Sequence, residues 1–161
     1  MKTVLVAMNA KYIHSNLAVY SLRAYAEAYK EHVEIAEYTI NQHMDDVLRD
    51  LYTKKADILC FSCYIWNRTY MEEVIREIKK VQPEVVIWMG GPEVSYDACE
   101  VLERLPEVTG VVLGEGEETF LELMEHYYEQ KSPLKEIDGI AYRDESNAIV
   151  QNPWRGVMDM S

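Results

Sequence analysis

The sequence has little positive charge and no long apolar stretch. Its 28 acidic residues outnumber its 16 basic residues, so the formal net charge is −12. A chain with this charge is repelled by the phosphate backbone of nucleic acids and by anionic membrane surfaces. No stretch approaches the ~20 apolar residues of a membrane-spanning helix, and the first residues lead into a strand-like segment rather than a signal peptide. We therefore expect a cytoplasmic protein with no nucleic-acid partner and no membrane partner.

Cysteine is also scarce. The three cysteines, Cys60, Cys63 and Cys99, are an odd number, and two of them lie within or just after an apolar run, where a disulfide framework would not place them. Cys60 and Cys63 have the C-x-x-C spacing of a zinc site, but a zinc site needs two further ligands and the sequence has no second pair. We expect reduced thiols and a core strand that ends in small residues.

Glycine is missing after the first apolar run. A dinucleotide-binding fold or a P-loop needs glycines there, so that the main chain can approach phosphates, and residues 9–16 contain none. A phosphoacceptor signalling domain needs acidic residues after its first strand and an aspartate after its third, where this chain has Asn9 and Ser62. These three classes are therefore excluded.

The chain instead has a regular alternation of short apolar runs and amphipathic segments. Parallel strands must be joined by crossover connections, and the amphipathic segments between the apolar runs can form the helices of these connections. We predict an α/β fold, a doubly wound five-stranded parallel sheet of the flavodoxin or Rossmann-like kind with strand order 2-1-3-4-5. The predicted strands are residues 3–8, 33–38, 58–62, 85–89 and 110–113, and the predicted helices follow residues 15, 45, 69, 97 and 116.

The pattern changes near Ile137. Two short apolar runs flank the polar residues 143–147, which indicates a small β-hairpin. We expect an α/β domain over residues 1–136, an appended hairpin over 137–152, and in residues 153–161 the start of a linker to a downstream domain.

Three of the apolar runs end in residues with small side chains or none. They lead into Ser62-Cys63, into Gly90-Gly91-Pro92-Glu93, and into Gly114-Glu115-Gly116. The carboxyl ends of parallel strands share one edge, where ligands bind. Paired glycines let a large ring lie against the main chain, whereas the acids after residue 114 disfavour a di- or triphosphate. The predicted ligand is bulky and mostly neutral.

With residues 9–16, these loops resemble the N-terminal cobalamin-binding domain of class B, cobalamin-dependent radical SAM proteins. That family includes methyltransferases and the anaerobic Mg-protoporphyrin IX monomethyl ester oxidative cyclase, and the resemblance covers nearly the whole chain. It implies that the domain binds cobalamin with the dimethylbenzimidazole tail inserted at the sheet edge. The sequence has no C-x-x-x-C-x-x-C cluster motif. The resemblance therefore assigns S-adenosylmethionine, the 4Fe-4S cluster and the radical chemistry to a downstream domain of the full-length chain.

The resemblance also implies a set of cofactor-binding residues. Residues 62–63 would line the slot for the tail, Gly90 and Gly91 would pack against the benzimidazole, residues 114–116 would meet the nucleotide loop, and residues 9–14 would face the corrin ring. The full set is Asn9, Lys11, Tyr12, Ser62, Cys63, Tyr64, Gly90, Gly91, Pro92, Glu93, Gly114, Glu115 and Gly116.

We expect that no protein imidazole holds the cobalt. Domains that ligate cobalt through histidine carry D-x-H-x-x-G after the first strand, and the residues around His14 have neither the aspartate nor the glycine. We therefore expect no histidine ligand to cobalt, no other metal ligand and no catalytic residue in this chain, which would not be a catalyst alone.

Two other functions remain open. A flavodoxin-like domain could bind FMN, although its phosphate needs a turn rich in Ser and Thr after the first strand and only Ser15 lies near. A domain of this fold could also dock a partner protein without any catalytic activity.

Overall fold

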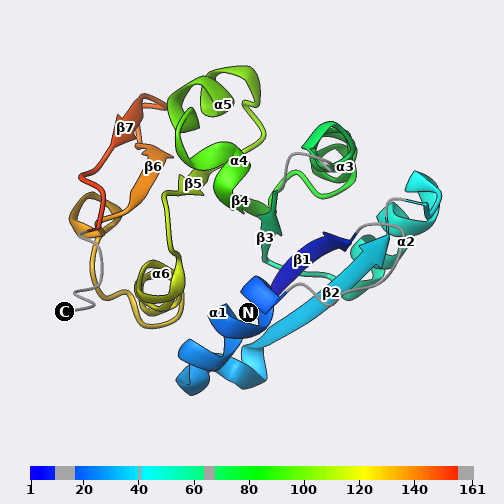
Figure 1. The fold of residues 1–161 in the computed structure, drawn as a ribbon, viewed down its shortest axis with the longest axis horizontal. Helices are drawn as coiled ribbons and strands as arrows, with labels where there is room; N and C mark the ends of the chain where they lie inside the picture. Colours follow the sequence, from blue (N-terminus) through cyan, green and yellow to red (C-terminus); the bar gives the residue numbers. More distant parts are fainter. Residues whose placement is uncertain (10–16, 40, 64–67, 156–161) are drawn as a thin grey trace.

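The computed structural model describes residues 1–9, 17–39, 41–63 and 68–155. A seven-stranded sheet, in the order β2-β1-β3-β4-β5-β6-β7, runs through the molecule (Figure 1). The first five strands pair in parallel, and their order is the predicted 2-1-3-4-5. The strands are β1 (Thr3–Asn9), β2 (Val33–Thr39), β3 (Ile58–Ser62), β4 (Val86–Gly90), β5 (Gly110–Val112), β6 (Ile140–Arg143) and β7 (Ile149–Gln151).

The C-terminal hairpin extends the sheet, so the prediction of a five-stranded sheet was two strands short. β6 pairs antiparallel with β5, and β7 pairs antiparallel with β6. Ile140 and Ala141 are fully buried there. The hairpin joins the sheet because β5 would otherwise present an unpaired edge.

Helices cover both faces of the sheet (Figure 1). Helices α1 and α6 pack together on one face, and α2, α3 and α5 supply the core on the other. Helix α4 was not predicted, because proline at the start of a single turn gives no periodic pattern. The helices are α1 (Leu17–Tyr25), α2 (Met44–Lys54), α3 (Arg68–Val81), α4 (Pro92–Ser95), α5 (Ala98–Arg104) and α6 (Glu117–Glu129), with 3-10 turns η1 (Glu27–His32) and η2 (Leu134–Glu136).

Strand side chains alternate between two cores. Val4, Val6 and Met8 belong to the core under α2, α3 and α5, whereas Leu5 and Ala7 face α1 and α6. Because both faces are buried, the parallel strands are apolar almost throughout. This alternation decides which residues of each strand can reach a ligand held on the α1 and α6 side.

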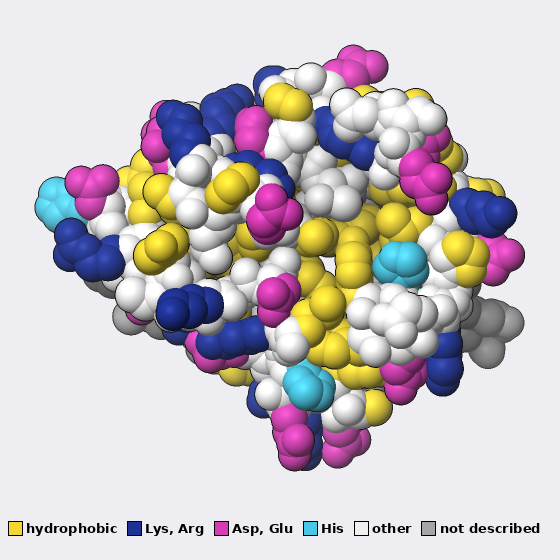
Figure 2. Space-filling model, turned by 180° about the vertical axis from the view of Figure 1, so that it is seen from behind, with side chains coloured by type: hydrophobic (Ala, Val, Ile, Leu, Met, Phe, Trp, Pro, Cys, Tyr) yellow, Lys and Arg dark blue, Asp and Glu magenta, His cyan; other side chains and the backbone are white. Residues whose placement is uncertain are grey.

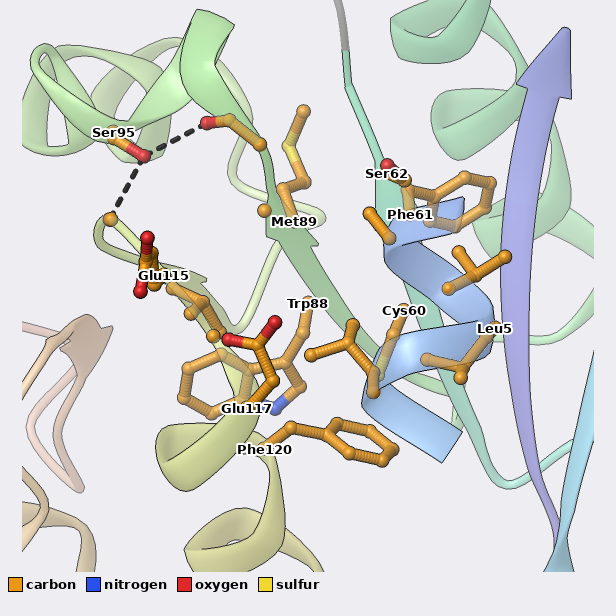
Figure 3. A pocket seen from close by; sticks show the side chains of 18 of the residues that line it. Leu5, Cys60, Phe61, Ser62, Trp88, Met89, Ser95, Glu115, Glu117 and Phe120 are labelled. Atoms are coloured by element: carbon orange, nitrogen blue, oxygen red, sulfur yellow. Dashed lines mark hydrogen bonds between the residues drawn. The ribbon is translucent and has the colours of Figure 1, made fainter. Parts of the chain in front are cut away.

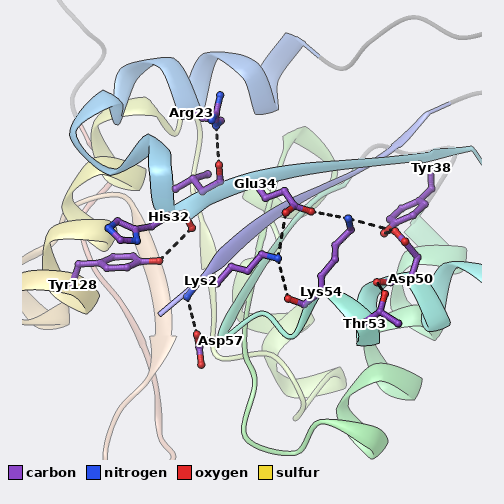
Figure 4. A network of polar contacts seen from close by, with 11 residues as sticks. Lys2, Arg23, His32, Glu34, Tyr38, Asp50, Thr53, Lys54, Asp57 and Tyr128 are labelled. Carbon is purple, nitrogen blue, oxygen red and sulfur yellow. Dashed lines mark hydrogen bonds and ion pairs between the residues drawn. The ribbon is translucent and has the colours of Figure 1, made fainter.

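Ion pairs between charged side chains lie at the end of the sheet where β1 and β2 begin (Figure 4). The Lys54 ammonium lies 2.6 Å from one carboxylate oxygen of Glu34, and the Lys2 ammonium lies 3.2 Å from the other. In the view from behind, hydrophobic side chains gather around a hollow near the middle of the face, with acidic and basic side chains around them (Figure 2). Among the described residues, no helix is both long enough and apolar enough to cross a membrane.

Candidate functional site

A cavity of about 390 Å³ lies between the sheet and helices α1 and α6 (Figure 3). It extends from the carboxyl ends of β3, β4 and β5 down to Cys60 and Trp88 in the middle of β3 and β4 and to Leu5 of β1. This is the edge at which parallel α/β sheets bind their ligands.

The walls of the cavity are mainly apolar. Most of the sheet residues in the wall come from the strand positions that face α1 and α6, and the two helices close the other side. These wall residues are Leu5, Val19, Leu22, Cys60, Trp88, Val112, Phe120 and Leu123. Phe61 and Met89 also line the cavity, although they belong to the core on the opposite face.

Trp88 forms a broad part of this wall. Its side chain is buried, and its indole N–H donates to the Tyr127 hydroxyl at 2.9 Å. Burial raises the pKa of Tyr127 to about 12, so the hydroxyl stays protonated at neutral pH. A Cβ on Gly110 would lie 2.4 Å from the Trp88 ring, so this ring position requires glycine at 110. Trp88 therefore offers the cavity a ring whose polar atom is already satisfied.

Cys60 places a thiol in the wall of the cavity. Burial raises the pKa of its thiol to about 12. At neutral pH the group is a protonated thiol, and only the thiolate is a good nucleophile or metal ligand. All three cysteines are free, and the described residues contain no group of three or more side chains that could hold a metal ion.

Two glycines build the rim of the cavity at the end of β4. A Cβ on Gly91, whose φ is +117°, would lie 2.3 Å from the Cys63 carbonyl oxygen. The Cys63 N–H also donates to the Gly90 carbonyl at 2.7 Å. Main chain therefore packs on main chain at this rim. A Cβ on Gly90, by contrast, would meet only Val112, at 3.6 Å, within van der Waals distance.

Ser95 connects two of the glycine loops. Its hydroxyl donates to the Gly91 carbonyl at 2.8 Å and accepts from the Gly114 N–H at 3.1 Å (Figure 3). Helix α4 positions this buried side chain one turn after the rim. The loops that follow β4 and β5 are thereby held at a defined separation.

Two carboxylates line the cavity from the loop between β5 and α6. Glu115 is exposed and Glu117 is half-buried in the first turn of α6. Within the described ranges, the structure records no hydrogen bond or ion pair for either carboxylate. They are free to accept hydrogen bonds from a ligand, and they disfavour an anionic group at this position.

The cavity brings together six of the thirteen residues predicted for the site. Asn9 and Cys63 are buried but are not part of the lining, and the Cys63 thiol packs in the core on the opposite face. Pro92 and Glu93 begin helix α4. Lys11, Tyr12 and Tyr64 lie outside the described residues. The residues in the lining are Ser62, Gly90, Gly91, Gly114, Glu115 and Gly116.

Sequence reasoning missed the apolar walls and Tyr96, which also lines the cavity, and it did not predict the bridging role of Ser95. An apolar strand or helix residue has the same periodic signature whether it packs in a core or lines a cavity. One signal was available for Trp88. It lies two residues before Gly90 in a strand, so both must face the same side of the sheet.

A family model described as the B12 binding domain matches residues 3–124. The chain belongs to this B12-binding domain family. The resemblance inferred from the loops is thereby confirmed, and cobalamin is the cofactor of the domain.

Relatives among characterised proteins agree. Over 94 residues the chain is 31% identical to the cobalamin-dependent radical SAM methyltransferase TokK of Streptomyces tokunonensis, which covers 58% of this chain and 14% of TokK. Over 97 residues it is 31% identical to the 2-(S-pantetheinyl)-carbapenam-3-carboxylate methyltransferase of Streptantibioticus cattleyicolor, covering 60% of this chain and 14% of the relative. The matched region is thus a small part of these longer proteins.

A solved structure shows the same fold. The cobalamin-dependent S-adenosylmethionine radical enzyme OxsB, with aqua-cobalamin and S-adenosylmethionine bound, matches with a TM-score of 0.78 and 20% identity. The match covers 98% of this chain and 23% of OxsB.

Proposed function

We propose that this cobalamin-binding domain holds the nucleotide tail of cobalamin in the cavity and serves a radical SAM methyltransferase. In this arrangement cobalt has no histidine ligand from the protein, and the radical SAM domain belongs to the same full-length chain. The observation that carries the proposal is the apolar cavity between the sheet and helices α1 and α6, with glycine main chain at its rim.

The chemistry of the cavity fits a neutral aromatic base. Removing such a ring from water is favourable when Leu5, Trp88 and Phe120 replace the water around it. The open rim at Gly90 leaves room for the rest of the nucleotide arm. Cobalamin supplies methyl-carrier chemistry when bound, and the protein supplies position and shielding from water.

The absence of an imidazole ligand to cobalt is inferred from the sequence around His14, which has neither the aspartate nor the glycine of the D-x-H-x-x-G motif. The Cys60 thiol, which lines the cavity, stays protonated at neutral pH because burial raises its pKa to about 12. The walls therefore bind the tail through apolar contact, and the protonated Cys60 thiol does not act as a metal ligand there.

The two methyltransferase relatives support the role in methyl transfer. Each is matched over 14% of its length, which leaves space in such proteins for a separate catalytic domain. An FMN site is the weaker alternative, because its terminal phosphate carries up to two negative charges, which the unpaired carboxylates of Glu115 and Glu117 disfavour more than the single charge of the phosphodiester in the cobalamin tail.

A matched pair of substitutions on α1 tests the place of the tail. Ala18 and Ala24 are both exposed on α1, but only Ala18 lines the cavity. We expect Ala18→Trp to obstruct the cavity and to weaken cobalamin binding at least about 10-fold, or 1.4 kcal/mol. Ala24→Trp should bind like the unchanged chain. The measurement is a visible-absorption titration with hydroxocobalamin, and equal affinity of the two variants would refute this placement.

The catalytic role needs the intact natural protein. After anaerobic isolation, we expect bound iron and sulfide together with cobalamin, and cleavage of S-adenosylmethionine to 5′-deoxyadenosine. A preparation that holds cobalamin but has neither iron nor this cleavage activity would contradict the radical SAM assignment.

A further inference from the structure

The side chains that line the cavity offer hydrogen-bond acceptors to a ligand but few donors. Glu115 and Glu117 are acceptors only when ionised. The indole N–H of Trp88 is already donated to Tyr127, and the hydroxyl of Ser95 is already donated to Gly91.

Three further polar side chains reach the lining, those of Tyr96, Ser62 and Cys60. Tyr96 is 87% exposed, so its hydroxyl is open to water. Ser62 has an interaction within the chain. The thiol of Cys60 is only a weak donor. Below the glycine rim the remaining side chains of the wall are apolar, so the part of a ligand that enters there with several bare acceptor atoms would lose its water without gaining partners.

The geometry points to selection among corrinoids by their lower base. This inference rests on the proposed place of the nucleotide tail. The cavity accepts an apolar ring, such as dimethylbenzimidazole or a cresol, and rejects a purine. The corrin ring and the phosphate are common to all these ligands, so the wall residues around Cys60, Trp88 and Phe120 decide the preference.

The physical reason is the free-energy cost of burying a hydrogen-bond acceptor that has no donor. Adenine presents several ring nitrogen lone pairs and one amino group, whereas dimethylbenzimidazole in the tail has a single bare ring nitrogen and cresol has none. Glu117 can accept from the amino group, but a carboxylate repels lone pairs. One buried acceptor left without a donor weakens binding by about 10-fold or more.

The test uses four corrinoids and the purified chain. Cobalamin, the adenine analogue and the p-cresol analogue differ only in the lower base, and cobinamide lacks the nucleotide. We expect the benzimidazole and cresol forms to bind at least about 10-fold more tightly than the adenine form, as measured by equilibrium dialysis.

The outcomes separate the inference from the proposed function. Equal binding of the adenine and benzimidazole forms, both tighter than cobinamide, overturns base selection and leaves the tail in the cavity. Cobinamide binding as tight as cobalamin binding overturns the proposed tail site and the inference with it.

A conservative substitution tests the role of the wall directly. Cys60→Ser keeps the side-chain shape and adds a stronger donor to the lining, so the preference against adenine should shrink several-fold. Cys99→Ser is the matched control, since Cys99 is on α5 outside the cavity, with its thiol directed to Gln151. An unchanged ratio in Cys60→Ser, with binding retained, would contradict donor shortage as the cause.

Discussion

At the residue scale, the two adjacent glycines at the end of β4 have different tasks. Gly91 has a φ of +117°, and its Cα lies so close to the Cys63 main chain that no side chain fits. Gly90 has ordinary space around it, and what it provides is an open wall beside Val112. One glycine is needed for folding and the other for the ligand.

Alanine at each position should separate these tasks. Gly91→Ala forces a Cβ to within 2.3 Å of a carbonyl oxygen, so we expect a loss of about 1–3 kcal/mol or more in the free energy of unfolding. Gly90→Ala should change it by less than about 1 kcal/mol, yet weaken cobalamin binding because its methyl group enters the cavity. Urea unfolding and a cobalamin titration measure the two effects. A stable Gly91→Ala variant would contradict the steric account.

At the element scale, a buried carboxylate joins α3 to α5. Glu72 on α3 accepts from the Arg68 guanidinium at 3.0 Å and from the Arg104 guanidinium at 2.7 Å. Burial of Glu72 raises its pKa, but the hydrogen bonds from the two arginines outweigh this, and the pKa lies below its ordinary value. The ionised form is therefore the form that stabilises the folded state.

This lowered pKa sets the sign of a pH effect. The stabilisation by Glu72 is complete above the ordinary glutamate pKa of about 4.3 and is lost as the pH falls through the lower folded-state pKa. We expect Glu72→Gln to lower the free energy of unfolding at pH 7 by about 1–3 kcal/mol and to reduce its fall between about pH 5 and pH 3. Urea unfolding across this range measures both.

A surface glutamate on the same helix provides the control. Glu77 lies 3.0 Å from Lys80, with 46% of its side chain exposed. Exposed pairs contribute little, so Glu77→Gln should change the free energy of unfolding by less than about 1 kcal/mol. If the two variants had the same pH profile, the buried ion pair would not be the source of acid sensitivity.

Across the whole molecule, cobalamin binding and folding are coupled. The cavity is formed by β1, β3, β4, β5, α1 and α6 together, so it exists only in the folded chain. A ligand that binds only the folded state stabilises it in proportion to the logarithm of its concentration.

Thermal unfolding should show this coupling. Free cobalamin at 100 times its Kd adds about 2.7 kcal/mol, which for a chain of this size raises Tm by roughly 5–10 °C. FMN at the same concentration should leave Tm unchanged, because the carboxylates at the cavity disfavour its phosphate. A larger shift with FMN would restore the flavin alternative.

Much of the fold was predictable from the sequence. Buried parallel strands are nearly continuous apolar runs, and their order followed from the common arrangement of doubly wound sheets. The sheet pairing of residues 140–151 was not predictable, because it depends on the edge of β5, which is distant in the chain. The short helix α4 gave too brief a pattern to be recognised.

The sequence by itself determined which loops meet at the carboxyl edge and which glycines leave main chain bare there, because strand ends and glycines are local properties. Only the tertiary structure decided that Leu5, Trp88 and Phe120 line a cavity instead of a closed core. That outcome depends on how far α1 and α6 stand from the sheet. Their separation is set by the packing of many side chains that are far apart in the chain.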